Sequence, residues 1–460
     1  MSLTVKLKNI GILKQAEFSL GDLTIICGEN NTGKTYTAHA LYGFLKDWRS
    51  LIRVPISDEQ IQQSLEGAIE IESKQEIDQM LAEACKIYSD QLGQIFAAPE
   101  DEFQDSEFRL LTDKIEAGDK EFGGRAKGPQ GQSVTFSSKR KASGELSINL
   151  GIEDPEKEFD INIAKKIINV IIADAIFSDS LPRPFIFSSE RTGVTIFRRE
   201  LDFARNRLLE EMGRSDQKID LRELLFKGYQ RYPLSIEDDV EFTRQLQDVA
   251  KSKSFIAKEH PETLEDFADI IGGDYAVTQD DQLYYKPKGT RLRLPMGQSS
   301  SSVRSLLAIG FYLRCAVEKG DLLMVDEPEL NLHPKNQRRI AKLFARLVNL
   351  GVKVFITTHS DYIVKELNTL IMLNHDKPHL KRVSEENNYR DSELINADQV
   401  KAYVAEKALM PLEKGQKRRR PGHTLVPADI DPEFGIEVDS FDEAINDMNR
   451  IQRDIVWGAK

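Results

Sequence analysis

The stretch LTIICGENNTGKTYTAHALYGFL, residues 23–45, decides the fold. An apolar run that suits a buried strand leads into a turn bounded by Gly28 and Gly33, and a helical pattern follows. The turn has the spacing G-x-x-x-x-G-K-[ST] between a strand and a helix, which is the context that this phosphate-binding motif requires. The glycines let successive N–H groups at the helix start face inward and cradle phosphates. The sequence therefore predicts a nucleotide site; the alternative is a glycine turn that binds nothing.

Individual side chains of this turn have predicted roles. Lys34 is expected to reach the β- and γ-phosphates of the nucleotide, and the Thr35 hydroxyl is expected to bind Mg²⁺. The predicted nucleotide-binding set from this stretch is Gly28, Glu29, Asn30, Asn31, Thr32, Gly33, Lys34 and Thr35.

Length and composition indicate a globular protein with more than one lobe. The 460 residues exceed one ordinary core, and the chain is 40% hydrophobic and 30% charged. No apolar run approaches the roughly 18–20 residues that span a bilayer, and the N-terminus lacks the pattern of a secretory signal. Cys27, Cys85 and Cys315 lie far apart without metal-binding spacing, which predicts a reduced, cytoplasmic location. The net charge of −12 argues against a surface coated with nucleic acid but permits a local basic groove.

A second constellation lies at residues 321–334, DLLMVDEPELNLHP. Its apolar run predicts a buried parallel strand that delivers Asp326 and Glu327 at its carboxyl end, where ligands of such sheets bind. Asp326 is expected to support Mg²⁺, and Glu327 is expected to polarise the attacking water as a general base. The alternative is an acidic strand end that only faces solvent.

Another predicted strand, VKVFITTHS, ends at His359. A single histidine is more often structural than catalytic, but this one terminates a strand expected beside that of Asp326. We therefore predict that His359 contacts the γ-phosphate.

Two further polar clusters are less specific. Ser299–Ser302 precede an apolar helical run; serines cap helix N-termini, and a capped N-terminus can also receive a phosphate. Ser188, Ser189, Glu190 and Arg191 leave the end of the short strand 185–187, where they are either ligand groups or an ordinary solvated turn.

The remaining patterns predict a coarse organisation. They indicate a hairpin over 3–20, a helical insertion over 57–96, an antiparallel region over 107–150, a helix over 160–177, a compact helical lobe over 196–270 and two strands over 274–294. The expected division is 1–50, the N-terminal part of a nucleotide-binding core; 51–190, a helical and β insertion; 191–270, a helical lobe; 271–375, the C-terminal part of the core; and 376–460, a C-terminal extension.

In this order, the motifs from Gly28 to His359 resemble the head domain of ABC-type ATPases, a group that includes SMC, RecF and overcoming-lysogenization-defect (OLD) proteins. The resemblance implies an α/β head with a mixed sheet, an antiparallel β subregion and helical insertions. It also implies ATP hydrolysis with Mg²⁺, and homo-oligomers formed through ATP-sandwich dimers. In such heads a signature helix, L-S-G-G-[QE], from a second subunit closes over the γ-phosphate. By resemblance Ser300, Ser301 and Ser302 complete the neighbour's site; serines in place of both glycines, and Val303 in place of the polar residue, imply slow hydrolysis.

The form DEPELNLHP, with His333 where transporters carry a D-loop aspartate, and the turn SSERTG resemble bacterial anti-phage ATPases of the Septu PtuA and PARIS AriA type. That resemblance implies a separate nuclease or toxin effector, with a DNA or phage component as a further candidate partner and no membrane. OLD relatives instead carry a Toprim nuclease after the ATPase.

The last 100 residues are too short for such a nuclease. They are expected to hold one or two strands (TLIMLN, residues 369–374), a basic turn (Lys417–Arg420) and an amphipathic helix near the C-terminus. Two other functions stay open: a DNA-repair or chromosome-maintenance ATPase acting directly on DNA, which would bind DNA in a salt-sensitive manner, and a self-contained nuclease, which would cleave nucleic acid with metal alone.

Overall fold

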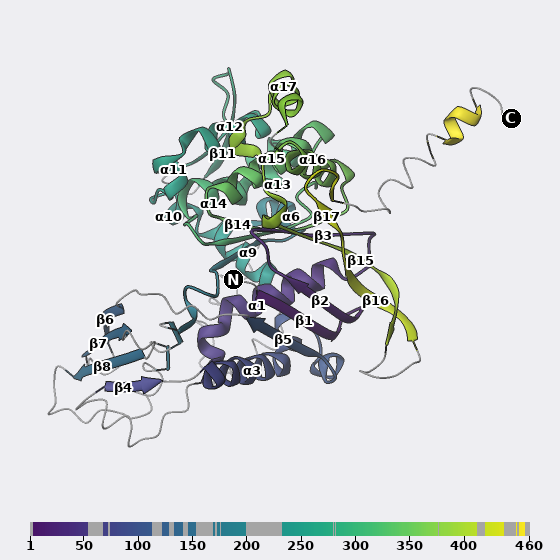
Figure 1. Ribbon diagram of the computed structural model, residues 1–460. Coiled ribbons are helices and arrows are strands. Elements are labelled where there is room, and N and C mark those ends of the chain that lie inside the picture. The colour runs from purple at the N-terminus through teal and green to yellow at the C-terminus, as the bar shows by residue number, and fades with distance from the viewer. Residues whose placement is uncertain are drawn as a thin grey trace, which may run out of the picture.

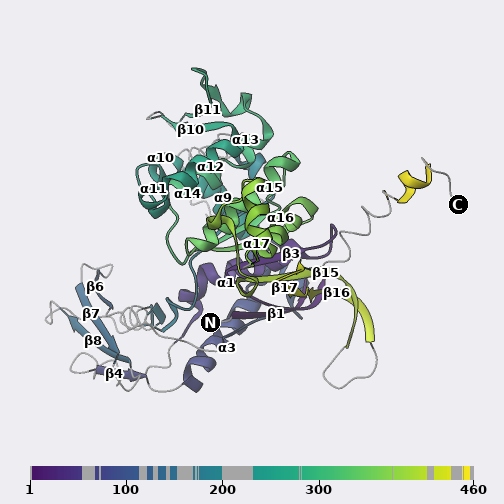
Figure 2. The ribbon, with the colours of Figure 1, turned by 45° about the horizontal axis from the view of Figure 1, so that its top comes forward.

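The computed structural model describes residues 3–53, 68–71, 74–112, 122–127, 133–140, 146–152, 169–170, 173–174, 176–198, 232–278, 280, 282–375, 377–411, 419–436, 448 and 450–455. The nucleotide-binding motifs lie in the centre of the molecule, between a mainly helical part and a part rich in strands (Figures 1 and 2). Among the described residues, no helix has the length and apolar character that crossing a membrane requires.

A nine-stranded mixed sheet forms the frame, in the order β5-β1-β2-β16-β15-β3-β14-β13-β9. From β15 to β9 neighbouring strands are parallel, whereas β1 pairs antiparallel with both β2 and β5, and β15 with β16. The strands are β1 (Leu3–Ile10), β2 (Leu13–Ser19), β3 (Leu23–Cys27), β5 (Glu107–Thr112), β9 (Pro184–Phe187), β13 (Leu322–Asp326), β14 (Lys353–Thr358), β15 (Val400–Pro411) and β16 (Arg419–Pro427).

Three smaller sheets surround this frame. The largest lies to one side of the molecule in Figure 1 and contains β4 (Ala68–Ile71), β8 (Leu146–Ile152), β7 (Ser133–Arg140) and β6 (Phe122–Lys127), all antiparallel. The others are β10 (Gly273–Val277), β11 (Leu283–Pro287) and β12 (Leu294–Pro295), and the short pair β17 (Ile430–Asp431) and β18 (Gly435–Ile436).

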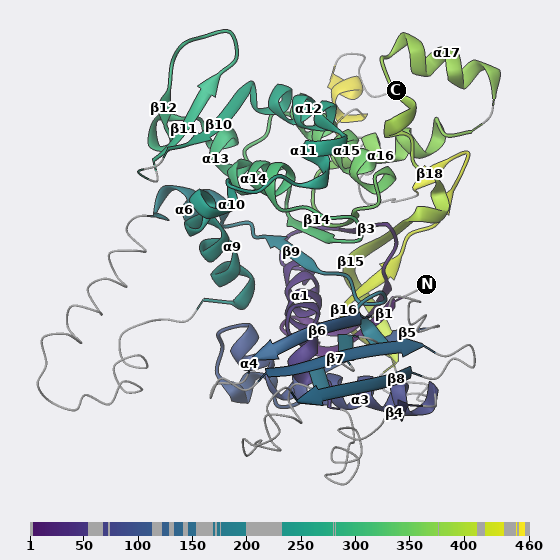
Figure 3. The same cartoon turned by 90° about the vertical axis from the view of Figure 1, so that its left-hand side faces the viewer.

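Helices make up a second large part of the described chain. Figure 3 shows α1 running away from the parallel strands, opposite the helices that follow residue 300. The helices are α1 (Lys34–Leu51), α3 (Lys74–Asp90), α4 (Leu92–Ile95), α6 (Arg191–Ile196), α9 (Leu234–Arg244), α10 (Leu246–Val249), α11 (Phe255–Glu259), α12 (Pro261–Ile271), α13 (Ser301–Ser305), α14 (Leu307–Cys315), α15 (Pro334–Asn349), α16 (Asp361–Met372) and α17 (Pro378–Glu386). Short 3₁₀ turns occupy Glu100–Phe103, Met296–Gln298, Asp391–Glu393 and Ala397–Gln399.

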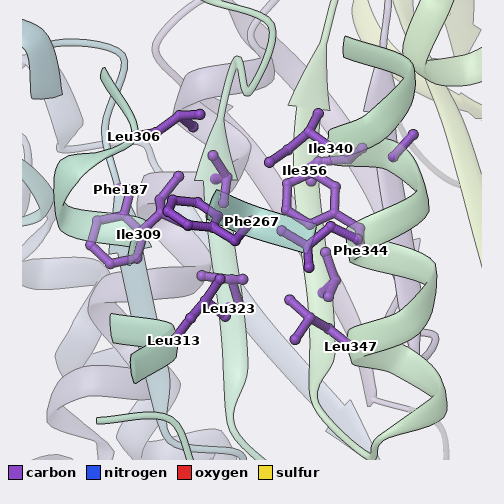
Figure 4. Packing of buried hydrophobic residues seen from close by; sticks show 14 of the residues in the cluster. Phe187, Phe267, Leu306, Ile309, Leu313, Leu323, Ile340, Phe344, Leu347 and Ile356 are labelled. Carbon is purple, nitrogen blue, oxygen red and sulfur yellow. The ribbon is translucent and has the colours of Figure 1, made fainter. Parts of the chain in front are cut away.

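The parallel strands are buried on both faces, which explains their nearly continuous apolar sequences. On one face, alternate residues such as Met324 and Phe355 join the core formed with α1, α3, β1 and β2. On the other face, Leu323 and Ile356 pack against α14 and α15 (Figure 4). Fully burying each such side chain contributes about 1.5–3 kcal/mol, so this sandwich fixes where the strand ends lie.

The predicted fold class is confirmed: the chain is an α/β protein with a mixed sheet, a separate antiparallel sheet and helical insertions. The hairpin over 3–20 and the two strands over 274–294 are also present as β1–β2 and β10–β11. Of the predicted helix over 160–177, residues 169–170, 173–174 and 176–177 are described and are helical, and the rest lies outside the described residues. Residues 199–231 of the segment 196–270, Lys417–Arg418 and most of the C-terminal helix also lie outside the described residues. Arg419 and Arg420, which were expected in a basic turn, begin strand β16 instead, where they pair with β15.

Two sequence-based assignments were wrong. Residues 369–372 of TLIMLN belong to helix α16, because Ser360 caps that helix and its apolar residues recur at helical spacing from Ile363 to Ile371. Within the expected helical stretch 57–96, residues 68–71 form β4, whose backbone is paired with β8. Periodicity alone cannot separate a short buried helical segment from a strand.

Candidate nucleotide-binding site

The turn between β3 and α1 has the backbone that its glycines predict. Gly28 and Gly33 have φ of 135° and 102°, and Asn31 lies in the left-handed region at 61°. Gly33 precedes α1 and offers no side-chain cap, so the first N–H groups of the helix are left for a ligand. Gly28 is also needed for space, because a Cβ there would lie 2.4 Å from the carbonyl oxygen of Ala405 in β15.

Lys34 is folded back over this turn. Its Nζ donates to the carbonyl oxygens of Gly28 at 2.9 Å and Glu29 at 2.6 Å, and the side chain is buried. An ammonium group has three donors, so one remains for an anion. Burial lowers the pKa of Lys34, while Glu327 and Asp326 act in the opposite direction.

The strand end of β13 meets the start of α1. Thr35 Oγ1 donates to Asp326 Oδ2 over 3.1 Å, and Thr357 in β14 donates to the other carboxylate oxygen. A hydroxyl and a carboxylate converge here from segments 291 residues apart. Mg²⁺ prefers oxygen ligands and is held by one or two carboxylates together with substrate phosphates and water. Asp326 and Thr35 therefore fit the metal, and the turn before α1 fits the phosphates.

Glu327 and His359 lie at the same edge of the sheet. His359 Nδ1 is 3.6 Å from Glu327 Oε1 and 3.2 Å from Glu329 Oε1. Glu329, which is buried, also accepts from the backbone N–H of His359 at 2.7 Å and from the Thr358 hydroxyl at 2.8 Å. Burial and the neighbouring Asp326 raise the pKa of Glu327. Glu329 thus orients His359, while Glu327 stays partly exposed toward the pocket.

A hollow of about 430 Å³ joins these groups. Ile12, from the turn between β1 and β2, and Tyr36 expose apolar surface at its edge. Its lining consists of Ile12, Asn30, Asn31, Thr32, Gly33, Lys34, Thr35, Tyr36, Glu327 and His359. The structure therefore brings the glycine turn, Glu327 and His359 to one pocket. Asp326 does not line the pocket itself but accepts a hydrogen bond from Thr35, which does.

The serine run does not line this pocket. Ser300 caps α13 by accepting from Val303 N at 3.3 Å, and its hydroxyl lies 2.9 Å from that of Ser302. Ser301 and Ser302 begin the helix and are half-buried. Ser300, Ser301 and Ser302 are therefore accessible to another molecule rather than to the pocket of their own chain, whereas Ser299 is buried, and a role in a neighbour's site stays a prediction.

Three functional candidates, Glu329, Thr357 and Tyr36, were not assigned a role from sequence, and a fourth, Arg191, was expected to be either a ligand group or part of a solvated turn, whereas it is buried. Glu329 accepts a hydrogen bond from His359, and Thr357 donates one to Asp326. Arg191 donates to the main chain of the DEPE segment. Tyr36 directly follows the motif, but a single aromatic residue in an amphipathic helix is usually read as core. Glu329 had one available indication, since it follows Glu327 at a two-residue interval in a segment already expected at the site.

Replacing Gly28 with alanine is expected to destabilise the protein by about 1–3 kcal/mol and to weaken nucleotide binding, because the backbone is left-handed and Cβ would meet the Ala405 carbonyl. Thermal unfolding and ATP titration measure the two effects. Gly297→Ala is the matched control, since a Cβ there meets nothing within 4 Å. Equal stability of both variants would contradict the expectation.

Asp239, a buried aspartate in α9, is bonded to the segment that follows β9. Ser188, after β9, donates to Asp239 Oδ2 through its N–H at 3.2 Å and its hydroxyl at 3.0 Å, so the sheet is bonded to α9. Asp239 is 1% exposed and its Oδ1 has no hydrogen-bond partner among the described residues. Burial raises the pKa of Asp239 to about 7.

This acid is expected to make stability depend on pH. A folded-state pKa above the unfolded value of 3.8 means that the folded state binds the proton more tightly. The contribution of Asp239 is therefore greatest at low pH and is lost as pH rises toward 7, by at most about 1.4 kcal/mol per pH unit. The stability advantage of Asp239→Asn over the wild type is expected to grow by roughly 3 kcal/mol as the pH rises from 5 to 8. Urea unfolding across that range checks it; parallel curves would show that Asp239 ionises normally.

The glycine turn before α1, the buried Lys34 and the acidic end of β13 are the features of a P-loop ATPase. Residues 1–364 match the family model described as AAA ATPase domain, and the chain belongs to that family. A search of curated proteins gave no match.

Solved structures that match the chain include SMC head domains. The SMC head domain from Thermotoga maritima is 12% identical, covers 94% of this chain and 100% of that chain, and has a TM-score of 0.32. The SmcHead bound to the C-winged helix domain of ScpA is 12% identical over 92% and 97% of the two chains, with a TM-score of 0.35. A third match, an Smc head with an extended coiled coil bound to the C-terminal domain of ScpA, derived from Pyrococcus furiosus, has 12% identity, coverage of 98% and 100%, and a TM-score of 0.33.

Proposed function

We propose that this ATPase is the nucleotide-dependent subunit of a bacterial anti-phage defence complex and that it controls a separate nuclease or toxin effector in the cytoplasm. The observation that carries its nucleotide chemistry is the convergence of Lys34, Thr35, Glu327 and His359 on one pocket, with Asp326 bonded to Thr35.

The residues divide the work of hydrolysis. The N–H groups of residues 28–35 and Lys34 bind the phosphates, and Glu327 takes the proton of the attacking water. His359, held by Glu329, contacts the γ-phosphate and distinguishes ATP from ADP. Thr35 and Asp326 would hold Mg²⁺, which would supply charge neutralisation on the phosphates.

A second copy completes the site in this proposal. Ser300, Ser301 and Ser302 lie at the start of α13, outside the pocket of their own chain, where hydroxyl and N–H groups can meet the γ-phosphate held by a neighbour. Two copies would then enclose two ATP molecules. The conformation of this dimer would hold or release the effector.

The defence role is supported by the DEPELNLHP segment and the SSERTG turn, on which the resemblance to defence ATPases rests. In the structure these two segments are in contact, since Asn331 donates to the Thr192 hydroxyl at 3.3 Å and Arg191 donates to the Asp326 carbonyl at 2.7 Å. The two segments that suggested the family are thus bonded to each other, and one of them carries Glu327 to the pocket.

Purification from the native operon tests the proposal. Light scattering with and without ATP gives the mass of the wild type and of Glu327→Gln, and mass spectrometry identifies any companion. We expect a large assembly that contains a second polypeptide, and loss of phage protection when Lys34→Ala replaces the wild type. A chain without a companion that binds DNA in a salt-sensitive manner would contradict the proposal and favour a repair or chromosome-maintenance ATPase.

A further inference from the structure

Arg191 is the first residue of α6 and is 1% exposed. Its guanidinium makes four hydrogen bonds, all to main-chain carbonyl oxygens. Nε donates to Ser305 at 2.9 Å, and one terminal nitrogen donates to Ser188 at 2.8 Å and to Asp326 at 2.7 Å. The other terminal nitrogen donates to Glu327 at 2.7 Å. One buried cation therefore joins the turn after β9, the acidic end of β13 and helix α13.

Such a contact set has a specific physical requirement. Burying an arginine removes its hydration, and only donation to several acceptors offsets that cost. The planar guanidinium spreads its donors over a fixed fork, whereas a lysine ammonium is a single point and cannot reach carbonyls on three segments. The site is thus built for arginine.

The carbonyl of Glu327 is the contact with the clearest consequence. Glu327 has φ of 50°, in the left-handed region that a glutamate seldom adopts without support. Its N–H donates to the Thr357 carbonyl at 3.0 Å, and its carbonyl accepts from Arg191. The unusual backbone, which aims the carboxylate at the pocket, is therefore held from both ends of the residue.

The other end of the guanidinium holds α13. Besides the bond from Nε to Ser305, the Thr195 hydroxyl of α6 donates to the Arg304 carbonyl at 3.2 Å. The Ser305 hydroxyl lies 3.3 Å from the Leu330 carbonyl, just after the DEPE segment. Displacement of α13 would therefore pull on the same arginine that fixes Glu327.

We propose that Arg191 is a positioning residue for ATP hydrolysis: it fixes the backbone of Glu327 and transmits to it the position of α13, the helix proposed above to meet a second copy. This inference rests on the general-base role proposed for Glu327. It assigns to the SSERTG turn a function in coupling, because the arginine of that turn connects the chain's own carboxylate with the helix that serves the neighbouring site.

Arg191→Lys in the full chain provides the test, with ATP and Mg²⁺ as the probe. We expect kcat to fall about 10- to 100-fold, because a small displacement of a catalytic group has effects of that size, while ATP affinity stays within about threefold of the wild type. Arg346→Lys is the matched control. Arg346, in α15, is also a buried arginine; it is bonded to Asp266 and Ser392 and does not line the nucleotide pocket. Its kcat is expected to stay within about twofold.

A second measurement separates positioning from general destabilisation. In Arg191→Ala, millimolar guanidinium is expected to restore part of kcat by occupying the vacated site, whereas the Arg346→Ala variant should show no such rescue. Unchanged kcat in Arg191→Lys, or parallel loss of kcat, ATP affinity and thermal stability without rescue, would overturn the inference. If Glu327→Gln hydrolyses ATP at the wild-type rate, the proposed general-base role of Glu327 is itself wrong. If Glu327→Gln loses kcat as expected but Arg191→Lys does not, only the positioning role of Arg191 is wrong.

Discussion

Lys34→Ala is expected to weaken ATP binding by about 100-fold or more and thereby to abolish hydrolysis. Charge-assisted hydrogen bonds contribute about 1.5–3 kcal/mol each, and every 1.4 kcal/mol is a factor of ten in affinity. The ammonium lies in the pocket beside Glu327, and it is the only lysine that lines the pocket in the described part of the chain. Titration with a fluorescent ATP analogue measures the loss.

The control for this variant is Lys46→Ala on the same helix. Lys46 pairs with Asp238 at 3.2 Å on the helix surface, and an exposed pair contributes little. ATP affinity should therefore stay at the wild-type value in that variant. The free energy of unfolding of Lys34→Ala should change less than its free energy of ATP binding. In the folded protein without ATP, the hydrogen bonds of Lys34 to the Gly28 and Glu29 carbonyls are offset by the hydration that the ammonium loses on burial. Retained affinity would place the phosphates elsewhere.

Local motifs explain which parts of this site could be predicted from sequence. The turn at residues 28–35 and the acidic pair at 326–327 each combine a buried strand with polar residues at its carboxyl end, and such strand ends meet at one edge of a parallel sheet. The bond between Thr35 and Asp326 is the direct result. The pairing of β3 with β14, and of β14 with β13, brings His359 to the same edge.

Long-range contacts account for what could not be predicted. Arg191 is bonded to Asp326 across 135 residues, and no local pattern distinguishes a buried arginine from a solvated one at the end of a strand. Strand β15 pairs parallel with β3, and its Ala405 restricts the space at Gly28. That pairing joins residues 23–27 to residues 400–404, so its existence depends on the assembled sheet rather than on the residues of either strand.

The helical assignment of residues 369–372 illustrates a further limit. The sequence TLIMLN is apolar enough for a strand, but Ser360 starts a helix nine residues earlier and the helix continues through it. Cap and periodicity have to be considered together over the whole segment 360–372. A short apolar run considered alone does not contain that information.

Glu327→Gln is expected to lower hydrolysis by about 10²- to 10⁴-fold, the contribution of a positioned general base, while ATP binding is retained. Glutamine preserves the size of the side chain and the backbone contacts of Glu327 with Thr357 and Arg191, but its amide cannot accept the proton of water. Phosphate release measured under single-turnover conditions, alongside ATP titration, separates the chemical step from binding.

Glu329→Gln supplies the contrast that assigns the base. Glu329 is buried and its Oε1 already accepts bonds from Thr358 and His359, so it is placed to orient rather than to activate water. A loss of less than about tenfold is expected for this variant, since the glutamine oxygen can accept the same bonds. If Glu329→Gln lost more hydrolysis than Glu327→Gln, Glu329 would be the base and Glu327 a supporting residue. If Glu327→Gln shows the larger loss, this variant should also form a dimer that light scattering detects in the presence of ATP. The reason is that the nucleotide enclosed between two copies is no longer hydrolysed.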